Sequence, residues 1–97
     1  MIDRLTADDF AAHVGRTLRP AGYDLALTLV ALDRHRHPGW EARERQPFSL
    51  ILSGPREPVL PEGFRRVAID GGPSLLLYVI PIFTVARDRQ DYQIVFN

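Results

Sequence analysis

Two histidines, His35 and His37, are the residues of this sequence whose type and spacing best match a metal site. On an extended segment, residues two apart lie on the same side, and Glu41 could supply a third ligand. Arg34 precedes the pair and Arg36 lies between the two histidines, and both would repel a cation. We therefore interpret both histidines as solvated loop residues and predict no metal site.

A serine nucleophile is a second chemistry to consider. Ser49, Ser53 and Ser74 lie in or near predicted strands, and none has the sharp Gly-flanked turn that exposes a catalytic serine. The sequence has no cysteine and no lysine, which excludes disulfides, thiolate catalysis and Schiff-base chemistry. The pair Gly71-Gly72 fits a turn better than a phosphate-binding loop. We predict a protein that is not an enzyme, with no catalytic residue and no cofactor.

The polar segment 33–46 is the longest stretch without a core pattern, and long irregular loops in small domains are often functional. It contains four arginines and the only tryptophan. We select four candidate partner-binding residues from it: Trp40, Arg36, Arg43 and Arg45. The same residues could hold single-stranded nucleic acid by charge and stacking, but Asp33, Glu41 and Glu44 dilute the positive charge.

The composition is that of one small globular domain, 1–97. By surface scaling, a chain of this length buries roughly 65% of its surface on folding. Hydrophobic residues make up 45% and charged residues 25%, which excludes a disordered chain. The net charge of zero supplies no overall attraction to nucleic acid or anionic membranes. The first residues lack a basic-then-apolar signal pattern, so we predict a cytoplasmic protein.

Period-2 alternation of apolar residues predicts strands, and short turns between them favour antiparallel pairing. The segment 5–15 is typical of a short helix, with Thr6 as its cap and Gly15 as its stop. The predicted strands cover 16–19, 23–32, 47–54, 64–70, 74–83 and 91–97. We predict a mainly β fold, a small antiparallel barrel or sandwich of about six strands with one short N-terminal helix.

The apolar run 74–83 is the most hydrophobic segment, and we interpret it as the central core strand. Its alternate residues are apolar on both sides, so we expect both faces to be covered or to lie against a partner. We also hypothesise that so short a chain forms a sheet that does not close and leaves an edge strand unpaired. Both features predict self-association or a tight complex with a β-rich partner.

Four blocks of the sequence carry a family resemblance. They are LTADDF at 5–10 with VG at 14–15, PFSL at 47–50 with GP at 54–55, LPEG at 60–63, and PI at 81–82 with the ending YQIVFN at 92–97. Together they resemble an uncharacterised family of bacterial proteins of about this length, encoded near phage-tail-collar-like proteins. The resemblance supplies no catalytic residues.

The resemblance implies a link to tail-like fibres. We therefore expect a non-enzymatic structural or assembly protein that contacts a larger partner, a tail-collar-like fibre protein. The alternative is a small ligand- or nucleic-acid-binding module that uses the 33–46 loop.

Overall fold

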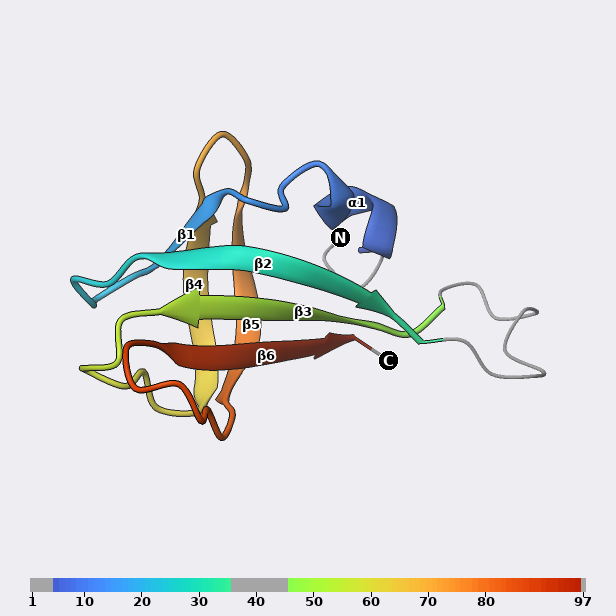
Figure 1. Ribbon diagram of the computed structural model, residues 1–97. Helices are drawn as coiled ribbons and strands as arrows, with labels where there is room; N and C mark the ends of the chain where they lie inside the picture. Colours follow the sequence, from blue (N-terminus) through green and yellow to red (C-terminus); the bar gives the residue numbers. More distant parts are fainter. Residues whose placement is uncertain (1–4, 36–45, 97) are drawn as a thin grey trace.

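A computed structural model describes residues 5–35 and 46–96 of the chain. The elements are α1 (Ala7–Ala11), β1 (Thr17–Pro20), β2 (Leu27–Arg34), β3 (Phe48–Gly54), β4 (Gly63–Ile69), β5 (Ser74–Pro81) and β6 (Gln90–Phe96). All strand pairs among them are antiparallel, and they form a closed barrel in the order β1-β2-β3-β6-β5-β4 (Figure 1). The prediction of a small antiparallel β fold with one short helix is confirmed, and the architecture is the barrel.

The sheet closes, so the hypothesis of an unpaired edge strand is wrong. The barrel closes through a short strand pairing between β5 and β6, in which Ile80 lies opposite Gln93 and Pro81 opposite Tyr92. The register of β2 against β3 shifts between Leu29 and Ala31. Such a bulge bends a strand and increases its twist, which helps short strands curl far enough to meet. In Figure 1, β4 and β5 run across the back of the layer formed by β2, β3 and β6.

The core lies inside the barrel and is built from alternate residues of the strands. Its buried members include Leu27, Leu29, Phe48, Leu50, Leu52, Val67, Ile69, Leu75, Leu77, Val79, Tyr92 and Ile94. The period-2 pattern therefore identified the inward residues correctly on β2, β3 and β6, whereas on β5 both sides are apolar and the pattern did not select one. One difference is the start of β2, which begins at Leu27 and leaves Tyr23 exposed in the preceding turn.

The helix α1 closes one end of the barrel through Phe10, which is 1% exposed. The Phe10 ring lies 5.9 Å from the ring of Phe48 and 5.4 Å from that of Phe96, and the latter two rings stack at 4.5 Å. The Asp9 carboxylate accepts a hydrogen bond of 2.7 Å from the backbone N–H of Thr6, which fixes the start of the helix.

The proline-rich connection between β3 and β4 is anchored to the core by one buried hydrogen bond. The backbone N–H of Leu60 donates to the hydroxyl of Tyr92 at 2.9 Å, and both residues are fully buried. A tyrosine in a core needs a partner for its hydroxyl, and here the partner is a loop amide. The interior of the barrel therefore determines where this loop lies.

Candidate partner-binding surface

The outer side of β4 and β5 exposes three apolar side chains, Phe64, Leu76 and Tyr78, which we call the aromatic face. Their exposed fractions are 68%, 41% and 38%. Phe64 lies opposite Tyr78 in the register, and the two rings meet edge to face at 4.9 Å. We expected both sides of the apolar run 74–83 to be covered or to lie against a partner, and within the described part of the chain the outer side is not covered. Its inner side is buried and its outer side is open.

Polar groups surround the aromatic face. The hydroxyl of Tyr78 donates a hydrogen bond of 2.6 Å to the carboxylate of Glu62. Arg66, directly opposite Leu76, is exposed and forms no ion pair with another described residue. An apolar centre with a polar rim is the usual composition of a protein interface.

The contact with Glu62 raises the pKa of Tyr78 above the ordinary tyrosine value, chiefly because the hydrogen bond favours the neutral phenol. Desolvation and the negative charge of Glu62 act in the same direction. We expect Glu62→Gln to lower this pKa, measured by ultraviolet absorbance of the phenolate during a pH titration. The same titration of the Tyr78→Phe variant identifies the contribution of Tyr78 to the absorbance curve. Identical curves for the wild type and Glu62→Gln would show that the carboxylate does not act on Tyr78.

The same shift has a consequence for stability. A raised pKa in the folded state means that the Tyr78–Glu62 contact contributes fully below the ordinary tyrosine pKa. The contribution is lost as the pH rises through the folded-state value. Because the Tyr78 hydroxyl is exposed, the main effect of its hydrogen bond with Glu62 is to orient the ring of Tyr78 within the aromatic face.

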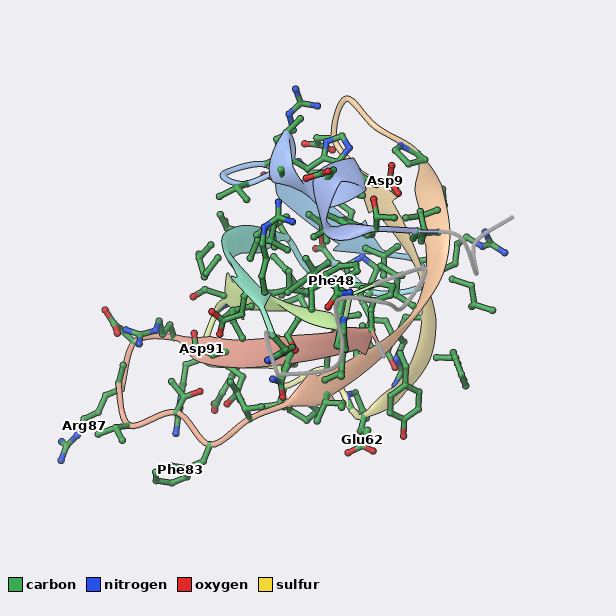
Figure 2. The ribbon with its side chains drawn as sticks, turned by 90° about the vertical axis from the view of Figure 1, so that its right-hand side faces the viewer. Asp9, Phe48, Glu62, Phe83, Arg87 and Asp91 are labelled. Atoms are coloured by element: carbon green, nitrogen blue, oxygen red, sulfur yellow. The ribbon has the colours of Figure 1, made fainter. Side chains whose placement is uncertain are left out.

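A second apolar feature is the 82–89 loop, which joins β5 to β6. Two of its side chains point into solvent, Phe83 with 92% and Val85 with 82% of its surface exposed. Figure 2 shows Phe83 projecting away from the barrel. Thr84, between them, is buried, and its hydroxyl donates to the backbone oxygen of Ile82 and accepts from the backbone N–H of Asp91, each at 3.0 Å.

Arg56 fixes the backbone of the 82–89 loop from the neighbouring β3–β4 connection. Its Nη1 atom donates to the backbone oxygens of Thr84, Ala86 and Arg89 at 3.2, 3.2 and 3.1 Å. The side-chain amide of Gln90, which is buried, donates to the oxygen of Ile82 at 2.8 Å. The loop is therefore held by polar contacts on its inner side and presents apolar groups on its outer side.

A Ser–His pair is present but does not form a reaction centre. Nε2 of His35 lies 2.7 Å from Oγ of Ser49, and the serine is only 1% exposed, so its hydroxyl is closed to a substrate. The backbone N–H of His35 also donates to the oxygen of Pro47 at 3.0 Å. Both contacts join the end of β2 to the start of β3, which is a structural role.

The histidine segment that was weighed as a metal site and the predicted binding residues lie mainly outside the described residues. Across 5–35 and 46–96, no three His, Asp or Glu side chains come together as a metal site. His37 and Glu41 of the histidine segment are not among the described residues. The same holds for the four selected partner-binding residues, Trp40, Arg36, Arg43 and Arg45.

Sequence reasoning missed Phe64, Phe83 and Val85, although the sequence contained a signal for the first. In 64–70 the inward positions are Val67 and Ile69, so Phe64 has the parity of the outward side. An aromatic residue on the outward side of an alternating strand is the pattern of an exposed contact residue. The signal for Phe83 was weaker, because it continues an apolar run whose inner side is part of the core.

None of the helices in the described ranges has the length and apolar character that crossing a membrane requires. The family described as a domain of unknown function (DUF6916) matches residues 5–96. No curated protein and no solved structure matches the chain.

Proposed function

The chain belongs to the DUF6916 family of domains of unknown function, and we propose that it is a non-enzymatic structural or assembly protein that binds a larger protein partner. The observation that supports this best is the aromatic face on β4 and β5. The outward side of an antiparallel sheet that faces water is normally polar. Here Phe64, Leu76 and Tyr78 are exposed on adjoining strands.

The composition of this surface suits a protein partner. Tyrosine and phenylalanine are enriched at the centres of protein interfaces, where water is excluded from the rings. The rim residues Glu62 and Arg66 supply polar groups around the centre. An exposed apolar face of this kind favours another protein over a small ligand, which binds in a concave site.

The partner itself is suggested by the family resemblance of the sequence blocks. A tail-collar-like fibre protein is therefore the first partner to test. The residues selected in the 33–46 loop stay a prediction for a second contact. The alternative of a ligand- or nucleic-acid-binding module depends on the same loop and also stays a prediction.

Phe64→Ser is expected to weaken binding to the tail-collar-like fibre protein by roughly tenfold or more, because truncating an aromatic residue at the centre of an interface removes a large contact. The measurement is calorimetric titration of the purified fibre protein with the wild type and the variant. Because Phe64 is exposed, the melting temperature should change little.

Val30→Ser is the matched control for this experiment. Val30 is 47% exposed on β2, outside the aromatic face, so the control should bind like the wild type. Equal affinity of Phe64→Ser and the wild type would remove the aromatic face from the proposal. Failure of the wild type to bind the fibre protein at tens of micromolar concentration would contradict the assembly function itself.

A further inference from the structure

The 82–89 loop carries two apolar side chains, Phe83 and Val85, that the rest of the described chain leaves exposed. Among the described residues, Phe83 and Val85 are the two most exposed large hydrophobic side chains. They flank a buried threonine, so their outward position follows from the way the loop is attached. Large apolar side chains that a fixed backbone keeps exposed to solvent are typical of the residues that anchor a protein interface.

Four backbone oxygens of the loop already accept hydrogen bonds from inside the protein. Arg56 donates to those of Thr84, Ala86 and Arg89, and Gln90 and the Thr84 hydroxyl donate to the oxygen of Ile82. Burying these four oxygens against a partner therefore removes little hydrogen bonding to water. The loop is also held in one conformation before binding, which lowers the entropic cost of association.

The aromatic face of another copy has the matching chemistry. It offers an exposed apolar surface at Phe64, Leu76 and Tyr78, and its rim carries Arg66 and Glu62. The loop carries adjacent charges of both signs, Arg87 and Asp88. These are exposed and form no ion pair with another described residue. Asp88 is complementary to Arg66, and Arg87 is complementary to Glu62.

A lipid surface matches the loop less well. Around its base, Arg56, Arg87 and Arg89 are balanced by Glu57, Asp88 and Asp91. Anionic membranes attract segments with an excess of lysine and arginine, and these six residues carry no excess of positive charge. A protein surface that carries charges of both signs is the better binding partner for the 82–89 loop.

We propose that the 82–89 loop of one copy docks on the aromatic face of a second copy. Within one chain, Phe83 projects away from the barrel in Figure 2 and is 92% exposed, so it does not pack on the aromatic face of its own copy. The contact is therefore heterologous, loop on face, and joins two copies. The inference rests on the proposed function because both use the aromatic face. It adds that a second copy competes with the larger partner for this face.

The size of the contact predicts weak association. An aromatic side chain buries about 150–250 Å² at most. One loop–face contact is thus small beside the ~800 Å² per partner of a stable interface. We expect reversible self-association in the micromolar to high-micromolar range.

Sedimentation velocity of the full chain over a wide concentration series tests this directly. The weight-average mass of the wild type should rise with concentration, and Val85→Ser should weaken association by roughly tenfold. Val14→Ser is the matched control, since Val14 is 44% exposed beyond α1, away from both surfaces, and should associate like the wild type. A wild type that stays monomeric at the highest concentration, or a Val85→Ser variant that associates equally, overturns the proposal.

Mixing two variants distinguishes loop-on-face contact from other forms of self-association. Phe83→Asp retains the face and Phe64→Asp retains the loop, and each alone should be mainly monomeric. Both residues are exposed, so both variants should fold, which circular dichroism checks. An equimolar mixture should regain association, because one intact loop then meets one intact face. If the mixture sediments as two separate monomers, the contact is not loop on face.

Two further measurements separate the failure of this inference from the failure of the proposed function. Flotation with anionic phospholipid vesicles should not retain the protein. Vesicle binding lost in Phe83→Asp would overturn the self-docking and make the loop a lipid anchor. A monomeric wild type that still binds the fibre protein through Phe64 contradicts the self-docking alone and leaves the proposed function standing.

Discussion

Leu77→Ala should lower the free energy of unfolding by about 2–5 kcal/mol, because it removes a buried side chain from a packed core and leaves a cavity. Leu77 is 3% exposed on the inner side of β5, between the buried residues Leu75 and Val79. Small domains have a total stability of about 5–15 kcal/mol, so the loss is a large fraction of it. Urea unfolding followed by circular dichroism measures the change.

Leu76→Ala is the control for that experiment. Leu76 is the next residue on the same strand, is 41% exposed and points outward. The same chemical change should therefore cost much less there. Equal losses at the two positions would contradict the alternation of β5 between core and solvent, and an unchanged midpoint for Leu77→Ala would show that β5 does not contribute to the core.

Phe10→Ala should cost about 3–5 kcal/mol, the usual range for truncating a buried phenylalanine. Its ring contacts the rings of Phe48 and Phe96 at the end of the barrel. The five-residue helix α1 is far too short to be stable alone, so it depends on this contact. We expect a lower melting temperature together with faster amide exchange in α1, measured by hydrogen–deuterium exchange.

Phe83→Ala provides the comparison for the loss of a phenyl ring. Phe83 is 92% exposed, and its removal should leave the melting temperature nearly unchanged. Normal protection of α1 in Phe10→Ala would contradict the view that this ring attaches the helix to the barrel. A large loss of stability in Phe83→Ala would mean that the 82–89 loop packs against the protein in solution.

The inner half of the fold could be predicted from local patterns. Alternation on 47–54 placed Phe48, Leu50 and Leu52 on one side of a strand, and all three are buried. The ending at 91–97 placed Tyr92 and Ile94 inward in the same way. A side-chain period of two depends on backbone geometry alone, so it can be read without knowledge of the neighbouring strands.

Closure of the barrel and the position of the candidate site could not be predicted in this way. Closure depends on the β2 bulge and on the pairing of Ile80 with Gln93, which are long-range features without a local signal. Phe83 belongs to an apolar run, but its strand ends at Pro81, and the following residues are directed by Arg56. Hydrophobicity alone does not distinguish a core residue from an exposed one when a distant side chain sets the backbone.

The attachment of the 82–89 loop by Arg56 separates the residues that maintain the fold from those that meet a partner. Arg56, Thr84 and Gln90 hold the backbone, while Phe83 and Val85 take little part in it. Members of a lineage can therefore exchange the two outward side chains without loss of stability. Binding preference can diverge at these positions while the barrel stays constant, and the same property makes the loop a place to install new specificities by design.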